Sequence, residues 1–241
     1  MTVILVGLGL EKDTIPVAAL EALRNCDLIL LENYTVDFPY SKEELEKTLK
    51  LELTAANRDM IEGLEFLEEA KKKNVGLLVY GDALSATTHI TIVEECRKQG
   101  IECKVFHNAS ILVAISETGL QLYKFGKTAS MPSWKEHTNK PTSFMKYIQE
   151  NKSIKAHTLL LTDIGLDIAD AMNQLTESSQ KEKVKLPEKI IACSNVGTDK
   201  QKIFYDTPEN LKEKEIPKPF CLIIPDELHF VEKAALESII I

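Results

Sequence analysis

The chain has 241 residues, of which 44% are hydrophobic and 27% are charged, as in an ordinary soluble protein. Its 37 acidic and 29 basic side chains give a net charge of −8, so we expect no binding of nucleic acid, whose phosphates need a basic surface. No apolar run approaches the roughly 20 residues that cross a bilayer, and the amino terminus lacks the basic segment of a signal peptide. The five cysteines are scattered without a Cys-x-x-Cys pair. They fit a reducing cytoplasm and indicate neither a disulfide framework nor a metal site.

Strands and helices alternate through the first half of the chain. Apolar runs predict strands at Val3–Val6, Leu28–Leu31, Val75–Tyr80 and Ile101–Phe106. Helical spacing predicts helices at Ile15–Asn25, Ser41–Leu49, Asn57–Lys73 and Ile90–Gln99. Thr14 is the expected N-cap of the first helix, and Ser41-x-x-Glu44 is a capping box for the second. This order implies right-handed crossovers and a largely parallel sheet.

Fewer helices separate the strands of the second half, which are predicted at Lys127–Met131, Thr158–Thr162, Lys189–Cys193, Lys202–Tyr205 and Cys221–Ile224. Longer polar stretches such as Ser178–Lys185 and Glu209–Lys218 join them, which favours a mixed sheet. We place a domain boundary near Leu112, on a helix predicted at Ile111–Gly119. The expected fold class is therefore α/β, with a largely parallel domain at residues 1–112, a mixed-sheet domain at residues 113–241 and a ligand cleft between them. The apolar segment Leu228–Ile241 is expected to dock on the core or on a second subunit.

The first strand ends in a glycine turn, Gly7-Leu8-Gly9-Leu10. Such a turn brings bare backbone to the carboxyl edge of a parallel sheet, where open α/β folds bind ligands. The dinucleotide fingerprint G-x-G-x-x-G fails here, because its third glycine falls on Lys12 and Asp13 follows. A ligand other than a nicotinamide dinucleotide is expected at this turn.

Two further strand-to-helix loops present polar side chains at the same kind of edge. In the loop from Gly81 to His89, Asp82 is a candidate acceptor for a ligand, and Ser85, Thr87 and Thr88 are candidate donors. The plainer interpretation is that Asp82 and Thr88 shape the turn and cap the helix. His89 is a candidate base, although a helix-cap role is favoured. Ser110, in His107-Asn108-Ala109-Ser110-Ile111, is a good N-cap, and its helix N-terminus would also favour a carboxylate. No hydrolase motif, P-loop or catalytic residue is assigned.

These three loops in order resemble the tetrapyrrole methylase-like class of S-adenosylmethionine-dependent methyltransferases, and within it the diphthine synthase family. The resemblance covers nearly the full length in the family's order. Other matching segments are Cys26-Asp27, Leu31-Glu32-Asn33-Tyr34-Thr35, Gly119-Leu120-Gln121-Leu122-Tyr123-Lys124-Phe125-Gly126, His157-Thr158-Leu159-Leu160-Leu161-Thr162-Asp163-Ile164 and Pro225-Asp226-Glu227-Leu228-His229-Phe230-Val231-Glu232.

The resemblance implies a homodimer that binds S-adenosylmethionine and releases S-adenosylhomocysteine. It also implies the reaction, which is repeated methylation of the amino group on a modified histidine (3-amino-3-carboxypropyl-histidine) of translation elongation factor 2, giving diphthine in diphthamide biosynthesis. Because a sulfonium methyl is already activated, positioning supplies most of the acceleration and no elaborate catalytic set is expected. By position, the family's cofactor contacts fall on Leu10, Asp82, Ser85, Ser110, Ile111, Thr162, Val196 and Phe220.

The chain departs from the family pattern at three places. Ala83 stands where the family usually has proline, and Phe220 stands where relatives often have histidine. Asp163-Ile164 is followed by Gly165-Leu166-Asp167 and a helix that looks shortened. Three other functions remain open: a related methylase of corrin or porphyrin precursors, a nicotinamide-dependent oxidoreductase, and a non-catalytic homologue that keeps the cofactor site.

Overall fold

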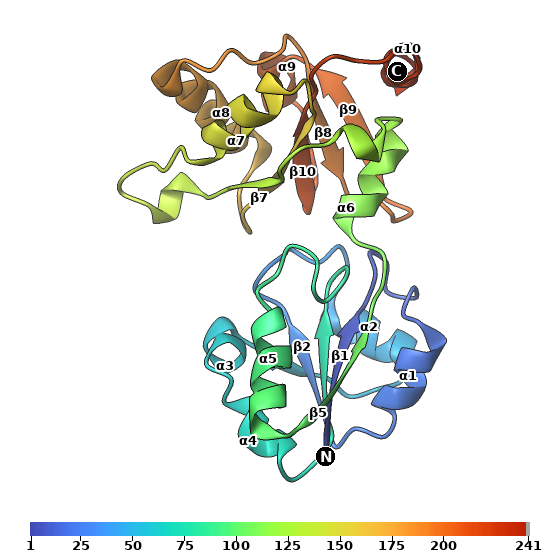
Figure 1. The fold of residues 1–241 in the computed structure, drawn as a ribbon. Helices are drawn as coiled ribbons and strands as arrows, with labels where there is room; N and C mark the ends of the chain where they lie inside the picture. The colour runs from blue at the N-terminus through green and yellow to red at the C-terminus, as the bar shows by residue number, and fades with distance from the viewer. Residues whose placement is uncertain (240–241) are drawn as a thin grey trace. The chain divides into compact units, whose positions relative to one another are not determined.

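The computed structural model describes residues Met1–Ile239, which fold as two compact units (Figure 1). The first unit covers Met1–Leu112 and the second begins at Val113, so the division falls within the short helix α6 (Ile111–Ala114). The last two isoleucines of the predicted docking segment, Ile240 and Ile241, lie outside the described residues. No helix within Met1–Ile239 is both long and apolar enough to cross a membrane.

The first unit is built on a five-stranded sheet in the order β3-β2-β4-β1-β5, with every neighbouring pair parallel. The largely parallel sheet predicted from the alternation of strands and helices is therefore confirmed. The strands are β1 (Thr2–Gly7), β2 (Leu28–Glu32), β3 (Thr54–Ala56), β4 (Val75–Val79) and β5 (Glu102–Phe106). The short edge strand β3 was not predicted, because two of its three residues are exposed and it has no apolar run.

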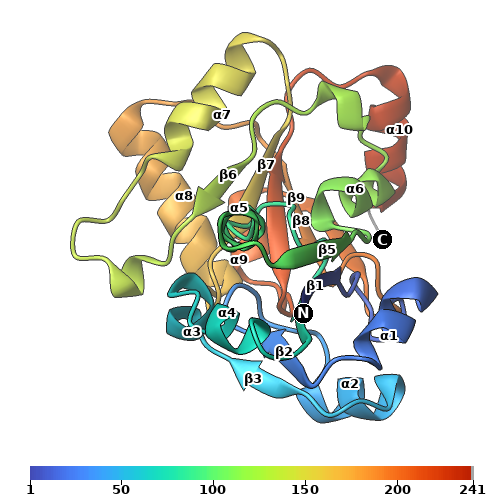
Figure 2. The ribbon, with the colours of Figure 1, turned by 60° about the horizontal axis from the view of Figure 1, so that its bottom comes forward.

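Helices cover both faces of this sheet (Figures 1 and 2). Successive side chains of a strand point to opposite faces, so Val3 and Leu5 of β1 pack in one apolar cluster and Ile4 and Val6 pack in the other. The first cluster lies under α3 (Arg58–Glu62), α4 (Phe66–Ala70) and α5 (Ile90–Gln99), and the second under α1 (Val17–Leu23) and α2 (Lys42–Leu49).

Two of the helices predicted before the domain boundary differ from the structure, and the helix predicted at Ile111–Gly119 is α-helical only over Ile111–Ala114. The single helix expected at Asn57–Lys73 is wrong, because it breaks into α3 and α4 where Leu64 takes a left-handed backbone with φ of 60°. That conformation cannot continue a right-handed helix. The first helix begins after Pro16, and the side chain of Thr14 donates to backbone carbonyls instead of capping it. The predicted capping box of α2 is confirmed.

The second unit holds a five-stranded sheet that is mixed, as predicted, and its strand order is β6-β7-β10-β8-β9. Only β6 and β7 are parallel, and the other neighbours are antiparallel. The strands are β6 (Ala129–Met131), β7 (Thr158–Thr162), β8 (Ile190–Ser194), β9 (Lys202–Asp206) and β10 (Phe220–Ile224). Its α-helices after α6 are α7 (Phe144–Ser153), α8 (Ile168–Glu182), α9 (Pro208–Lys212) and α10 (Phe230–Ile239), and its 3₁₀ turns are η1 (Ile115–Thr118), η2 (Leu122–Lys124) and η3 (Trp134–Glu136).

The helix that looked shortened after Asp167 is in fact the longest of the described chain, since α8 runs for 15 residues. Most of the polar stretch predicted to begin at Ser178 is therefore helical. Buried side chains recur at helical spacing along α8 as far as Ser178, although that last position is polar. Because Ser178 is polar, the apolar periodicity of the sequence does not extend to the last turn of α8.

Candidate cofactor site

The three predicted strand-edge loops of the first unit meet at the carboxyl edge of its sheet. Gly9 and Gly81 pair through two backbone hydrogen bonds, with N···O distances of 3.0 and 2.9 Å. At Gly7 a β-carbon would lie only 2.6 Å from the carbonyl oxygen of Gly81, so this close approach requires glycine. The glycine turn that failed as a dinucleotide motif therefore brings two strand ends into contact.

Two residues that the sequence analysis did not single out as site residues fasten these loops. Asn108 Nδ2 donates to the carbonyl oxygens of Gly7 (3.1 Å) and Thr14 (2.9 Å). Thr14 Oγ1 lies 3.1 Å from the carbonyl oxygen of Leu8. A β-carbon at Gly9, where φ is 78°, would lie 2.3 Å from Thr14 Oγ1. The side chains of Asn108 and Thr14 therefore fix the glycine turn by hydrogen bonds to its backbone carbonyls. No local sequence signal predicts these contacts.

The carboxylate of Asp82 links the second loop to the third. Its Oδ1 accepts from Leu84 N and Ser85 Oγ, and its Oδ2 accepts from Asn108 N and His107 Nδ1. Burial opposes ionisation of Asp82, but these four hydrogen bonds outweigh it and hold the pKa of the carboxyl below its ordinary value. Asp82 is therefore an ionised, buried carboxylate that joins two loops by hydrogen bonds, in agreement with the plainer interpretation that it shapes the turn. Its role at the predicted site is to fix the geometry of these loops.

The side chain of Tyr80 holds the backbone of Leu10 in place by a hydrogen bond. Tyr80 Oη donates to the carbonyl oxygen of Leu10 at 3.0 Å, and the Tyr80 ring packs edge-on against Phe38 at 5.2 Å. Burial, with a smaller contribution from Glu11, raises the pKa of Tyr80, so the hydroxyl remains a donor. The predicted contacts Leu10 and Ser110 are both buried, at 5% and 6% exposure.

The predicted contacts of the second unit also share one edge of a sheet. Thr162 ends β7 and Phe220 begins the antiparallel neighbour β10, and Thr162 Oγ1 donates to the carbonyl oxygen of Phe220. Phe220 in turn pairs with Ser194 at the end of β8, two residues before Val196. Leu10, Asp82, Ser85, Ser110 and Ile111 thus lie in the three-loop edge of the first unit or directly after it, and Thr162, Val196 and Phe220 in the edge of the second.

A buried acceptor without a donor lies beside Val196. Ser194 Oγ donates its single proton to the carbonyl oxygen of Pro217, so it accepts from Asn195 Nδ2. This fixes the amide orientation and leaves Asn195 Oδ1 buried with no hydrogen-bond partner within the described chain. An unpaired buried acceptor is costly, which makes the atom a natural partner for a ligand donor.

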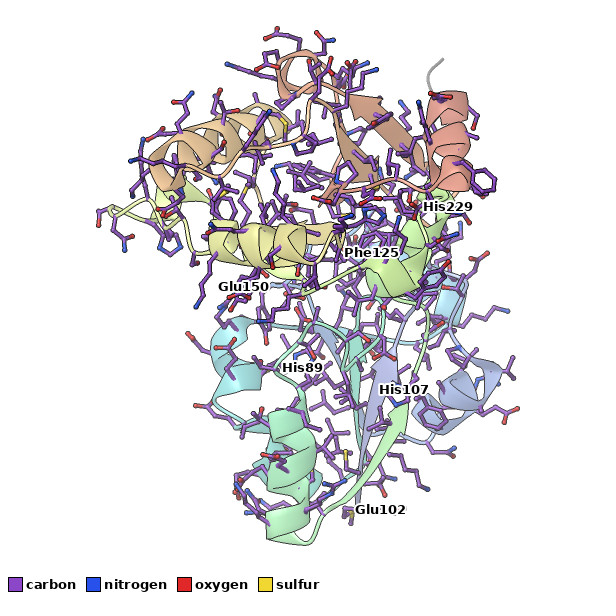
Figure 3. All side chains as sticks on the ribbon, turned by 45° about the horizontal axis from the view of Figure 1, so that its top comes forward. His89, Glu102, His107, Phe125, Glu150 and His229 are labelled. Atoms are coloured by element: carbon purple, nitrogen blue, oxygen red, sulfur yellow. The ribbon has the colours of Figure 1, made fainter. Side chains whose placement is uncertain are left out.

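Three of the segments that resemble the family in the second half meet in a network separate from these edges. Glu232 of α10 is completely buried and accepts from Gln121 N, His157 Nε2, Lys124 Nζ and His229 N. Figure 3 shows His229 at the start of α10. Burial opposes ionisation, but the hydrogen bonds and Lys124 lower the pKa of Glu232 to about 2. These segments therefore hold α10 on its own unit, and Leu236 of that helix is buried.

Comparison with known proteins agrees with this architecture. A family model described as tetrapyrrole (corrin/porphyrin) methylases matches residues 2–212. A diphthine methyl ester synthase of Schizosaccharomyces pombe is 34% identical over 97% of this chain and 93% of its own, and a diphthine synthase of Methanococcus vannielii is 36% identical over 97% of both. A crystal structure of diphthine synthase superposes with a TM-score of 0.89 at 32% identity, covering 99% of this chain and 96% of the other. The chain therefore belongs to the tetrapyrrole methylase family and, within it, to the diphthine synthases, which confirms the predicted resemblance.

The residues at the first unit's edge fit the cofactor that this family implies. Gly81 has a φ of 72°, and a β-carbon there would lie 3.7 Å from Ser110 Cα and 3.9 Å from Leu10 Cδ2. The absent side chain thus leaves room for one methyl-sized group in contact with two predicted contact residues. In the second unit, Asn195 Oδ1 supplies an acceptor without a partner among the described residues. No group of three metal-ligating side chains was found within Met1–Ile239.

Proposed function

We propose that this protein methylates the amino group of the modified histidine of translation elongation factor 2, giving diphthine in diphthamide biosynthesis, with S-adenosylmethionine as the methyl donor. The observation that carries the proposal is the three-loop edge of the first unit. There the bare backbone at Gly81 borders Leu10 and Ser110, in a chain whose relatives are diphthine synthases. Ser85, Ile111, Thr162, Val196 and Phe220 are proposed as further contacts of the same cofactor. A cytoplasmic homodimer is part of this proposal.

The site residues act by positioning. When bound, the cofactor supplies a methyl group already activated by its sulfonium. Transfer to a neutral amine would form an N–C bond as the S–C bond breaks, with the positive charge passing to nitrogen and S-adenosylhomocysteine released, and an N–H proton would pass to solvent before a further transfer. Orienting a neutral amine in line with the S–C bond accounts for up to about 7–11 kcal/mol of barrier lowering in favourable cases. Tyr80 and Thr14 fix the Leu10 turn for this purpose, and Asp82 fixes the loops on either side.

The test is incubation of the purified protein with S-adenosylmethionine and elongation factor 2 carrying the modified histidine, followed by intact mass. A ladder of methyl increments on the elongation factor is expected, and its length gives the number of transfers. A parallel incubation with a corrin or porphyrin precursor tests the related methylase activity. Binding of S-adenosylhomocysteine without methyl transfer to either substrate would replace the proposal with that of a non-catalytic homologue.

Removing the Asp82 carboxylate is expected to weaken S-adenosylhomocysteine binding at least about tenfold, or about 1.4 kcal/mol. In Asp82→Ala, four donors lose an acceptor that is itself buried, and no carboxylate joins the second loop to the third. The control is His107→Ala, which removes one of those donors from a side chain that is 67% exposed and should change the affinity less than about threefold. Calorimetric titration measures both. Unchanged affinity in Asp82→Ala would refute the placement of the cofactor at this edge.

A further inference from the structure

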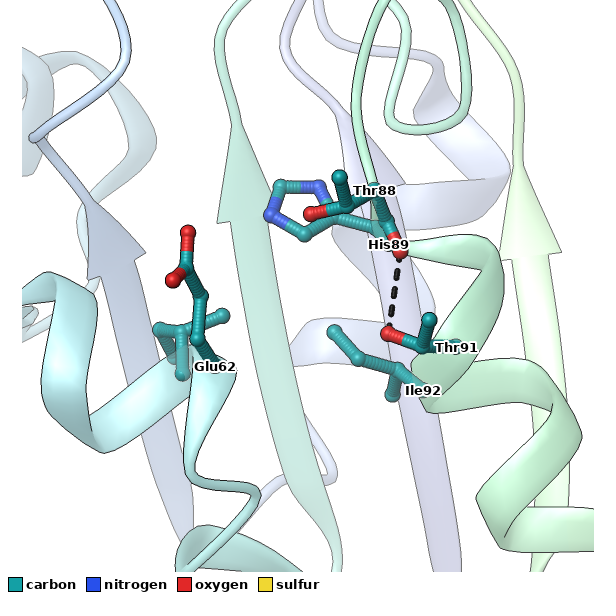
Figure 4. A pocket seen from close by; sticks show the side chains of 6 residues that line it. Glu62, Thr88, His89, Thr91 and Ile92 are labelled. Atoms are coloured by element: carbon teal, nitrogen blue, oxygen red, sulfur yellow. Dashed lines mark hydrogen bonds between the residues drawn. The ribbon is translucent and has the colours of Figure 1, made fainter.

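A pocket of about 280 Å³ lies between α3 and the start of α5 in the first unit (Figure 4). Its volume is slightly below the roughly 300–1,000 Å³ of small-molecule sites, so it suits one side chain better than a nucleoside cofactor. The pocket is lined by Ile61, Glu62, Thr88, His89, Thr91 and Ile92. Thr88 and His89 end the loop that contains Asp82, yet no step of the proposed reaction uses them.

One hydrogen bond orients the ring of His89 and identifies the nitrogen that donates to the loop. Its Nδ1 lies 3.2 Å from the carbonyl oxygen of Ala83, and because a carbonyl only accepts, Nδ1 carries a proton. In the tautomer with a single ring proton, that proton is on Nδ1 and Nε2 presents a lone pair, for which the structure gives no donor within Met1–Ile239. The side chain is 98% buried, since His89 is only 2% exposed. In Figure 4 the ring nitrogen remote from the backbone points toward the side of the pocket where Glu62 stands.

The other lining groups add one carboxylate, from Glu62, whose side chain is 48% exposed, and apolar surface. The partner of that carboxylate, Arg58, is an exposed neighbour on α3 at 3.7 Å, an ion pair of little energetic weight. Ile61 and Ile92 are buried at 1% exposure each and supply apolar surface for a methylene stem. None of the lining residues is a lysine or an arginine.

We propose that this pocket binds a basic side chain, lysine or arginine, presented by the protein substrate. An imidazole lone pair and a carboxylate both accept hydrogen bonds, and only a ligand rich in donors satisfies the two together. The overall charge of −8 favours a cationic partner. The inference deepens the proposed function, on which it rests for the identity of the protein that presents the side chain.

Two substitutions of His89 separate binding from folding. Asparagine places its amide nitrogen near the position of Nδ1, so His89→Asn keeps the hydrogen bond to Ala83 and deletes the acceptor at Nε2. In His89→Gln, the longer amide keeps an acceptor near the position of Nε2, but the hydrogen bond to Ala83 is lost. Glu62→Gln removes the pocket charge, and Asp59→Asn, on the same helix but outside the pocket lining, is its matched control.

Steady-state kinetics with the modified elongation factor are expected to show a KM for that protein raised about tenfold in Glu62→Gln and in His89→Asn, because each loses a hydrogen bond to a charged group. The KM for S-adenosylmethionine should stay unchanged, and Asp59→Asn should behave as the parent. The proposal is overturned if both pocket variants keep the parental KM, or if His89→Gln raises it more than His89→Asn does, since the loop contact would then be what matters.

A direct titration is independent of the methyl transfer. Ethylguanidinium and n-butylammonium, added to protein labelled with ¹⁵N at histidine, are expected to shift the His89 ring resonances to saturation in the parent and to need about tenfold higher concentration for the same shift in Glu62→Gln. The neutral isostere ethylurea should cause no such shift. If the parent fails to methylate the elongation factor but this titration succeeds, the proposed function fails and the basic-side-chain pocket stands. If methylation succeeds and neither cation shifts the resonances, the pocket proposal fails alone.

Discussion

Replacement of Gly81 by alanine is expected to raise the Kd for S-adenosylhomocysteine at least about tenfold, about 1.4 kcal/mol, while the protein still folds. The β-carbon would lie against Leu10 and Ser110, where the cofactor is proposed to approach the backbone. Its contacts at 3.7–3.9 Å are ordinary ones, so the substitution fits without a clash. The left-handed φ of 72° adds a cost of about 1–2 kcal/mol to folding.

Gly100 provides the matched control for this backbone cost. It ends α5 with a φ of 69°, and a β-carbon there would meet nothing within 4 Å. Gly100→Ala is therefore expected to lower the melting temperature about as much as Gly81→Ala does and to leave ligand affinity intact. Calorimetric titration and thermal denaturation of the two variants measure the two effects. Equal affinity in both variants would exclude the space at Gly81 as a cofactor site.

Substitution of Glu232 by glutamine is expected to cost about 3 kcal/mol of stability, because it leaves the Lys124 ammonium without its buried counter-charge. The amide also places a donor where the carboxylate accepts from other donors. The melting temperature of the second unit should fall by about 10 °C. Glu237→Gln, on the same helix, is the control. Its side chain is 60% exposed and lies 3.9 Å from Lys233, so a change below about 0.5 kcal/mol is expected.

The pH dependence of stability gives an independent check on Glu232. Its pKa is about 2 in the fold against an ordinary 4.5, so the unfolded chain binds more protons in that interval. The stability that Glu232 contributes is complete above about pH 5 and is lost as the pH falls toward 2. The parent should therefore lose about 3 kcal/mol more than Glu232→Gln between these limits in denaturant titrations. Parallel pH profiles for the two proteins would contradict a charged Glu232 in the fold.

Local periodicity predicted most of the architecture. The continuous apolar run of β1 and the capping box at Ser41 are signals contained within a few residues, so both appeared in the sequence and in the structure. The predicted helix over Asn57–Lys73 failed because apolar spacing continues across Leu64, although the backbone there is left-handed. The length of α8 was missed because its last buried position is the polar Ser178.

In the candidate site, the grouping of the loops could be predicted from the sequence, but the side chains that fix them could not. Parallel strands end at a common edge, so the order of strands and glycines sufficed to group the loops at Gly7, Gly81 and Ser110. The partners that fix those loops could not be predicted, because Asn108 reaches the carbonyl oxygen of Gly7 across 101 positions of sequence. A hydrogen bond over that separation depends on strand order and loop conformation together.

By itself the sequence determined the fold class, the family and the edge of the sheet where a ligand binds in such folds, because strand periodicity, glycine turns and motif order are local or sequential properties. Only the tertiary structure decided what each polar side chain does there. It made Asp82 a buried tie between loops, gave Nδ1 of His89 its proton and left Nε2 facing a pocket, and buried Glu232 against Lys124. The reason is physical: a side chain's charge state and free hydrogen-bonding groups depend on its neighbours in space, and those come from distant parts of the chain.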